Sequence, residues 1–582
     1  MSPTAPSPDP RVGLRAGWMD AAEAIWNLRV VARTRPSDAF YSPTTPGDRR
    51  LTNSDLAFIG NYAIQGNYSG TQIWDISNPR RPTLKVAYVC PGSQSDVSVY
   101  RNLLFVSGES TSGRLDCGLQ GVPDSVSHER LRGIRIFDVT DIANPKYLAN
   151  VQTCRGSHTH TVVTDPNDAA NVYIYVSGSA PVRSPNELPG CSGAAPDEDP
   201  NTALFRIEVI RVPLAHPEQA RIVSSPRIFQ DLVAPPRHAE LAADSIAQAA
   251  RRRAEGEDPA AAAAAAAARR RTGPTQCHDI TVYPAIGLAG GACGGYGLLL
   301  DIRDVANPKR IGAVADSNFS FWHSATFNND GSKMLFTDEW GGGSQPRCRV
   351  TDKYEWGANA IFTLGNHQMT FRSYYKMPAP QTVFENCVAH NGSLVPIPGR
   401  DVMVQGWYQG GISVFDWTDA ARPIEIAYHD RGPMDSTKLV SAGSWSVYWY
   451  NGYMISSEIS RGLDIFELAP SAFISQNEID AAKTVRFDYL NAQEQPRIVW
   501  PPSFPLARAY LDQLERSNGL ATDRIAAART ELARAERLSG QGRRDALTHL
   551  ATQLDGDVQR SAQPATARTL AGALRALANT AR

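Results

Sequence analysis

Histidines recur in this sequence at the start of strand-like segments, and their spacing suggests a shared site. Five of the eleven histidines lie in four short motifs. The motifs are Ser157-His158-Thr159-His160, Cys277-His278-Asp279, Trp322-His323-Ser324 and Ala389-His390-Asn391. If equivalent strands line one volume, imidazole nitrogens from distant parts of the chain converge there. Because imidazole binds first-row transition metals, the pattern predicts a metal site.

The elements that carry these histidines form a repeat of about 40 residues with four strand-like runs, the size of one propeller blade. Seven repeats start near residues 53, 94, 156, 276, 317, 385 and 440. The seventh repeat has only three clear strands. Near the N-terminal end, residues Trp26 to Arg33 show the alternation of apolar and polar side chains that is typical of a strand. We therefore predict an all-β fold, a seven-bladed β-propeller closed by an N-terminal strand, which leaves no free edge. The alternative is an open array of β-repeats.

Three regions stand outside the repeats or interrupt them. Residues 1–25 form an N-terminal extension to a propeller predicted over 26–500, and residues 230–273 form an Ala/Arg-rich insert. We expect the insert to be a solvated helix or a disordered loop, although its arginines would also suit anion binding. Residues 501–582 carry apolar side chains at helical spacing, which predicts a C-terminal helical bundle that packs or binds a protein partner.

A second motif marks the third strand of several repeats. It reads GTQIWDISNPRRP, RGIRIFDVTDIANP, YGLLLDIRDVANP and QGGISVFDWTDAARP. Its Asp and Asn side chains cap the turn, and its proline ends the strand's hydrogen-bond ladder. These motifs resemble the LVIVD-repeat family of bacterial β-propeller proteins over roughly residues 50 to 466. The resemblance implies the propeller fold and says little about chemistry.

Superposing the inner strands by the turn that follows each one defines one ring position. It holds Asp55, Asp96, His160, His278, His323, His390 and Trp445. We predict that the four histidines and two aspartates bind copper, zinc, iron or manganese. His158 lies two residues before His160 and should face the same way, as a ligand or proton shuttle, whereas Asp279 should point opposite to His278. The alternative is a water-filled polar channel with hydrogen-bonded histidines.

The second strand of each blade returns to the face where the inner strand begins. Its end brings further side chains to this face, namely Glu109, Asp338, Glu339, Trp340, Trp407, Tyr408 and Glu458. We select Glu339 and Glu458 as candidate catalytic groups, because a carboxylate beside a metal can orient an imidazole or act as general base. The aromatic side chains could wall a substrate pocket. Taken singly, each glutamate also fits a salt bridge or a rim position.

The eight cysteines form an even set without a CxxC pair, which favours disulfides in an oxidising compartment over zinc knuckles. The repeat geometry suggests the pairs Cys90–Cys117, Cys154–Cys191, Cys277–Cys293 and Cys348–Cys387. The N-terminus shows no signal peptide. We nevertheless expect a secreted or periplasmic protein, and the alternative is an intracellular protein with free buried thiols.

The composition excludes several partners. A net charge of −1 gives no basic field for nucleic acid, and no apolar run reaches the roughly 18 to 20 residues of a membrane span. The sequence therefore favours a metal-dependent enzyme, an oxidoreductase or a hydrolase or lyase, that acts on a small molecule. The alternative is a non-catalytic extracytoplasmic scaffold or a protein-interaction propeller.

Overall fold

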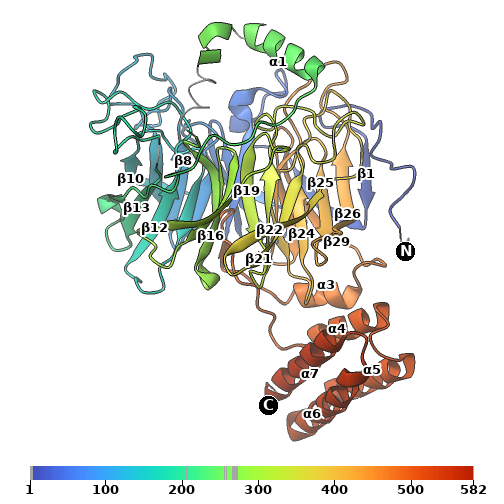
Figure 1. The fold of residues 1–582 in the computed structure, drawn as a ribbon. Coiled ribbons are helices and arrows are strands. Elements are labelled where there is room, and N and C mark those ends of the chain that lie inside the picture. The colour runs from blue at the N-terminus through green and yellow to red at the C-terminus, as the bar shows by residue number, and fades with distance from the viewer. Residues whose placement is uncertain are drawn as a thin grey trace.

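Seven antiparallel sheets surround a central channel in the computed structural model (Figure 1), which confirms the predicted seven-bladed β-propeller. The structure describes residues 4–580 except 205, 255, 257, 262 and 265–272. The inner strands of neighbouring blades lie against one another around the channel. They are β3 (Asn53–Ile59), β7 (Val97–Tyr100), β11 (His160–Val163), β15 (Cys277–Tyr283), β19 (Trp322–Phe327), β23 (Gly392–Val395) and β27 (Ser444–Tyr450).

Three further strands complete each blade outward. The second strands are β4 (Tyr62–Asn67), β8 (Leu103–Gly108), β12 (Asn171–Val176), β16 (Leu288–Cys293), β20 (Lys333–Asp338), β24 (Val402–Gly406) and β28 (Tyr453–Glu458). The third strands are β5 (Gly70–Asp75), β9 (Gly133–Asp138), β13 (Glu208–Pro213), β17 (Tyr296–Asp301), β21 (Asn359–Gly365), β25 (Ile412–Asp416) and β29 (Gly462–Leu468). The outer strands of blades one to six are β6 (Thr83–Val89), β10 (Lys146–Gln152), β14 (Arg221–Ser224), β18 (Lys309–Val314), β22 (Gln368–Tyr375) and β26 (Ile424–Arg431).

The ring closes with a strand from the N-terminal end, as predicted. β2 (Leu28–Thr34) pairs with β29 and supplies the outer strand of blade seven. The predicted single strand from Trp26 is in fact two strands. β1 (Glu23–Trp26) adds a fifth strand to blade six, and Asn27, at φ 55°, turns the chain toward β2. Blades six and seven are thereby joined through one short N-terminal segment.

The lower end of the channel is crossed by residues 489–498, here called the channel plug. Its first residues form β30 (Tyr489–Leu490), which pairs with the inner strand of blade one. The Asn491 side chain bonds both backbone groups of Val99 in blade two, at 2.7 and 2.9 Å. The Gln495 backbone N–H donates to the Val282 carbonyl in blade four at 2.9 Å. The sequence did not predict this plug, because no repeat pattern marks it.

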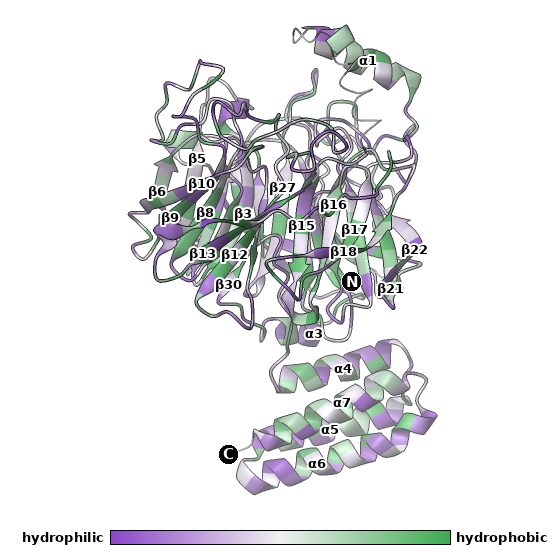
Figure 2. Cartoon of the chain, turned by 60° about the vertical axis from the view of Figure 1, so that its left-hand side comes forward, coloured by the Kyte–Doolittle hydropathy of each residue, from purple (hydrophilic) through white to green (hydrophobic). Residues whose placement is uncertain are grey.

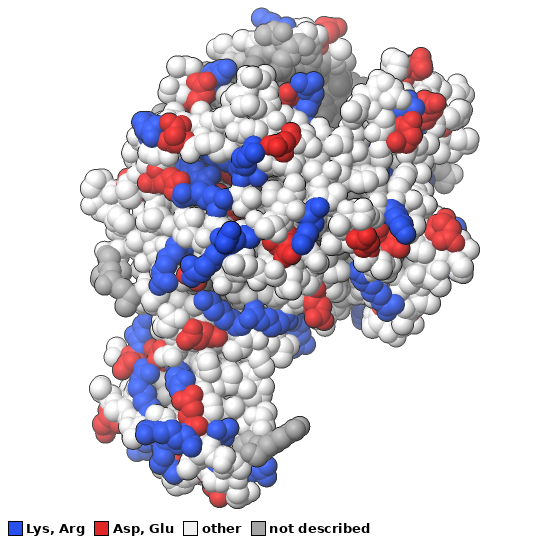
Figure 3. Space-filling model, turned by 180° about the vertical axis from the view of Figure 1, so that it is seen from behind, with Lys and Arg blue, Asp and Glu red and all other residues white. Residues whose placement is uncertain are grey.

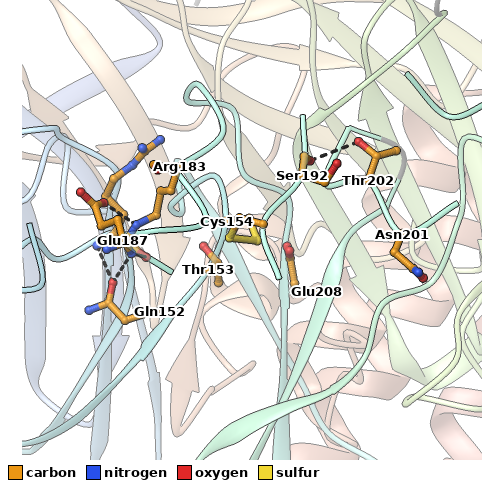
Figure 4. Close-up of a disulfide and its surroundings, with 12 residues drawn as sticks. Gln152, Thr153, Cys154, Arg183, Glu187, Ser192, Asn201, Thr202 and Glu208 are labelled. Carbon is orange, nitrogen blue, oxygen red and sulfur yellow. Dashed lines mark hydrogen bonds and ion pairs between the residues drawn. A yellow bond between two sulfur atoms is a disulfide. The ribbon is translucent and has the colours of Figure 1, made fainter. Parts of the chain in front are cut away.

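Four disulfides join exactly the cysteine pairs that the repeat geometry suggested, and the described residues include no free cysteine. Figure 4 shows the Cys154–Cys191 bridge between the end of β10 and a long loop of blade three. Beside it, Arg183 contacts Glu187 at 2.6 Å and donates to Gln152 at 2.5 Å. The bridges therefore fasten loops at the upper end of the channel.

The C-terminal region is a helical bundle below the propeller (Figure 1). Its helices are α4 (Phe504–Arg516), α5 (Thr522–Arg537), α6 (Gly540–Asp557) and α7 (Pro564–Asn579), preceded by α3 (Gln476–Ala482). Each helix alternates hydrophobic and hydrophilic residues (Figure 2), and the apolar residues share one buried core. Buried Glu478 in α3 fixes the bundle to the propeller, because it accepts hydrogen bonds from both Arg400 and Arg516.

Short 3-10 helices and the upper helix α1 also belong to the fold. The 3-10 helices are Asp38–Phe40, Arg49–Leu51, Pro217–Gln219, Pro284–Ile286 and Val558–Arg560. The insert carries α1 (Ala242–Ala254) above the channel mouth, while its arginines at 269–271 lie outside the described residues. Charges of both signs are interspersed on the face in Figure 3. Among the described residues, no helix is long and apolar enough to cross a membrane.

Candidate metal centre

Four histidines from four consecutive blades stand in a row at the upper end of the channel. His158 precedes β11, His278 and His323 lie near the starts of β15 and β19, and His390 precedes β23. The distances between successive ring centres are 4.6, 4.0 and 4.2 Å along the order His158, His278, His323, His390. The two ends of the row, His158 and His390, are 232 residues apart in the sequence, and each ring in the row contacts the next.

The Nδ1 atom of each of these rings has a partner. His158 bonds the Glu109 carboxylate, and His278 bonds Asp279 at 2.9 Å. His390 bonds the carbonyl of Trp445, and His323 lies 3.4 Å from the Thr337 hydroxyl. A carboxylate or carbonyl accepts a hydrogen bond, so the proton of a neutral ring sits on Nδ1 and the lone pair on Nε2. This is the arrangement that orients histidines in metal sites.

The Nε2 atoms of His278, His323 and His390 converge on one carboxylate. They lie 4.0, 3.8 and 3.6 Å from the oxygens of Glu339. Tyr408 donates its hydroxyl to the same carboxylate at 2.5 Å. A tetrahedral metal with bonds of about 2.0–2.2 Å spaces its ligand atoms roughly 3.3–3.6 Å apart. The observed distances approach that value, and His323, Glu339 and His390 form a group whose ligand atoms lie close enough together to hold a metal ion.

The electrostatics favour metal-binding forms of the central rings. Burial and the neighbouring histidines lower the pKa of His323 well below its usual range and that of His390 to about 3. His323 Nε2 is buried without a hydrogen-bond partner among the described residues, a costly state that a cation would relieve. Burial raises the pKa of Glu339, which also presents an oxygen here. His158 differs, because burial is outweighed by the charge and hydrogen bond of Glu109 together with the charges of Glu339 and Asp279, and its pKa is raised.

A repeated β-bulge aims these side chains into the channel. In blade four, Cys277 pairs with Cys293 and Ile280 with Gly291, so His278 and Asp279 together oppose only one residue. Blades one, five and seven shift register at the same place. A bulge re-aims side chains, so Asp279 contacts the imidazole of His278. The prediction that Asp279 points opposite to His278 is therefore wrong.

The other predicted ligands form a lower tier and do not join the converging group. His160 Nδ1 bonds Ser107 at 2.8 Å and lies 3.6 Å from Asp96. Asp55 accepts hydrogen bonds from Tyr448 and Asn391 at 2.7 and 2.8 Å. Within the described residues, two groups have metal-ligand spacing: His278, Asp279 and His323, and His323, Glu339 and His390. Neither contains Asp55, Asp96 or His160.

Two of the three predicted catalytic residues lie beside the cluster. Glu339 faces the three Nε2 atoms, and His158 packs edge-to-face against His278. Glu458 does not join them, because its carboxylate accepts from the Gly443 and Ser460 backbone and pairs with Arg461 at 3.0 Å. These bonds hold the loop after β28 in place, so the contacts of Glu458 are structural.

Several groups around the rings were not predicted from the sequence. Glu109 and Tyr408 lie on the predicted face, but their contacts with His158 and Glu339 were not predicted. Thr337 and the Trp445 carbonyl carried no recognisable signal, because any residue offers a carbonyl and threonine is common in strands. Glu109 was easier to predict, since it directly follows the second strand of its blade, as Glu339 does.

Comparisons with known proteins add weak structural likenesses only. No protein-family model and no curated protein matches this chain. A periplasmic gluconolactonase of Pseudomonas aeruginosa is similar with 11% identity and a TM-score of 0.41, over 71% of this chain and 99% of that one. Kuenenia stuttgartiensis hydrazine synthase is similar with 10% identity and a TM-score of 0.39, over 70% and 92%. Likenesses of this size do not assign a function.

Proposed function

We propose that this protein is a metal-dependent enzyme that acts on a small molecule at the upper end of its channel. A first-row transition metal, copper, zinc, iron or manganese, would be held by Nε2 of His278, His323 and His390. The observation that carries the proposal is that three nitrogens with engaged Nδ1 partners converge on Glu339. The metal would supply Lewis-acid or redox chemistry, which suits an oxidoreductase, a hydrolase or a lyase.

The protein groups have separate roles in this proposal. Glu339 accepts a proton from a bound substrate or water, or donates a ligand oxygen, and the Tyr408 hydroxyl fixes its orientation. His158 is the outermost ring, with 23% of its side chain exposed, and is paired with Glu109. It is placed to carry a proton between the centre and solvent, or to serve as a fourth ligand. Glu458 has no part in the chemistry.

Metal analysis of the purified protein tests the centre. After supply of copper, zinc, iron and manganese, we expect stoichiometric metal in the wild type and none in a His278→Ala, His323→Ala variant. A matched control replaces His216 and His549, which are exposed and lie far from the channel, and should keep the metal. A metal-free wild type, or equal metal in all three proteins, would refute the proposal.

A second measurement separates an enzyme from a scaffold with a structural metal. Catalytic sites keep an open coordination position, whereas structural sites are closed. Azide added to the cobalt- or copper-substituted protein should therefore change its visible spectrum. An unchanged spectrum would favour the alternative, a non-catalytic scaffold whose loops or C-terminal helices bind a partner.

The cellular location and the family are also proposals. Four disulfides indicate an oxidising, extracytoplasmic environment, and we propose a periplasmic or secreted protein on that basis. Membership of the LVIVD-repeat family rests on the third-strand motifs alone, since no family model matches.

A further inference from the structure

A pocket of about 290 Å³ lies beside the histidine row at the channel mouth. Its walls come from the two ends of the insert, residues 234–238 and 273–276, and from the loops of blades four and five. Its volume lies at the lower end of the range for small-molecule sites, so it suits a compact ligand and not a polymer.

The pocket opens directly onto the candidate metal centre. His278 is part of its lining, as is Phe321, whose ring lies 5.6 Å from the imidazole of His278. The side chains of His323 and His390 are 0% and 2% exposed, whereas His278 is 9% and His158 23% exposed. A molecule that reaches the centre must therefore approach from the side of His278 and His158.

One wall of the pocket is held in place by the insert. His238 packs its ring against Trp340 at 4.6 Å and lies 3.3 Å from the Ser320 hydroxyl. Asp244 bonds Arg347 and Arg349 at 2.9 and 2.7 Å. The described start of the insert is thus docked on blade five, while α1 itself is a largely exposed helix, as expected from the sequence.

The lining combines flat apolar surface with positive charge. Pro235, Pro274, Phe319 and Phe321 supply apolar walls, and Phe319 packs on Trp322 with ring centres 4.8 Å apart. Arg237 is the lining residue with a permanent charge, and the described lining contains no Asp or Glu. Apolar walls bind a ring, and a guanidinium binds a carboxylate or phenolate.

We propose that this pocket binds a small aromatic acid, a carboxylate or phenolate, and presents it to the metal centre. The proposal rests on the proposed function and deepens it by naming a substrate class. Arg237 anchors the anionic group, Phe319 and Phe321 hold the ring, and the His278 side of the pocket receives the reacting end.

Calorimetric binding of benzoate, benzyl alcohol and benzylamine to the metal-free protein tests the proposal without interference from direct metal–carboxylate bonds. Benzoate should bind about tenfold more tightly than benzyl alcohol, as expected for one hydrogen bond to a charged group, and benzylamine more weakly still. Arg237→Gln should abolish the preference for benzoate and keep the wild-type metal content. Arg303→Gln is the control, since Arg303 is an exposed arginine of blade four that is paired with Asp301 and does not belong to the pocket lining.

The outcomes separate this proposal from the proposed function. A His323→Ala, His390→Ala variant, whose replaced side chains do not line the pocket, should lose its metal yet keep the preference for benzoate over benzyl alcohol. If the wild type contains no metal but shows that preference, the proposed function fails and the anion pocket stands as a binding site. Equal binding of benzoate and benzyl alcohol, or an Arg237→Gln variant that binds benzoate like the wild type, would overturn the pocket assignment.

Discussion

The contact between Asp279 and His278 makes a sharp prediction about metal affinity. Asp279 is 1% exposed, and its carboxylate bonds His278 Nδ1 at 2.9 Å. Asp279→Asn keeps the shape of the side chain and one acceptor oxygen. It removes the negative charge that makes the His278 imidazole a better metal ligand. Loss of such a partner typically lowers metal affinity by about tenfold to a hundredfold. This corresponds to roughly 1.4–2.8 kcal/mol of binding free energy.

Two further variants calibrate this effect. Thr337→Val removes a neutral, 3.4 Å contact to His323 and should lower affinity less than Asp279→Asn does. Asp55→Asn is the matched control, because it is an equally buried channel aspartate that contacts Tyr448 and Asn391 and no ligand ring. Asp55→Asn should change the metal affinity by no more than about twofold, which is well below the tenfold to hundredfold loss expected when a histidine ligand loses its partner.

Competition between the protein and a zinc chelator at pH 7 measures these affinities, with circular dichroism to verify folding. If Asp55→Asn weakens zinc as much as Asp279→Asn, the total charge of the channel controls binding and the specific contact does not. If neither variant changes the affinity, His278 is not a ligand.

Two predictions concern stability. Burial, with the charges of Asp55 and Asp279, raises the pKa of Asp96 well above its usual value, so the folded protein keeps a proton that the unfolded chain releases. The resulting penalty grows as pH rises above the unfolded pKa of about 3.9, so the stability of Asp96→Asn relative to the wild type should increase between pH 4 and 8 in urea unfolding. A difference that is constant with pH would contradict this. The Cys154–Cys191 bridge closes a separation of 37 residues, so the Cys154→Ala, Cys191→Ala variant should lose about 4 kcal/mol of unfolding free energy. A loss below about 1 kcal/mol would show that the reduced chain is already constrained there.

Much of the fold was predictable because propeller blades are local repeats. The missing fourth strand of the last repeat pointed to the N-terminal strand that became β2. The turn motif with its Asp and Pro fixed the third strands, and the cysteine pairs followed from equivalent blade positions. The channel plug was not predictable, because Asn491 and Gln495 bind distant strands through side chains and leave no periodic pattern.

The candidate site was predictable in its residue types and only partly in its contacts. The equivalence of His278, His323 and His390 follows from strand register, and the structure brings these rings together. The predicted roles of His158 and His160 are reversed: His158 joins the row of imidazoles, and His160 does not. The reason is that β11 begins at His160, so His158 lies before the strand. The direction of the Asp279 side chain was predicted wrongly, because side chains do not alternate between the two faces of a strand at a β-bulge. The sequence carries no mark of this bulge.

The channel plug also sets an order of events during synthesis. The last of the proposed ligand histidines is His390, whereas β29 of blade seven ends at Leu468 and the plug follows at 489–498. A chain that emerges from the N-terminal end can therefore gather its four rings while the ring of blades is open. β2 must wait for β29, and the lower end is sealed only afterwards. If the proposed centre binds a metal, the ion would have access from below during this interval, whereas in the finished protein it would have to pass the mouth beside His278.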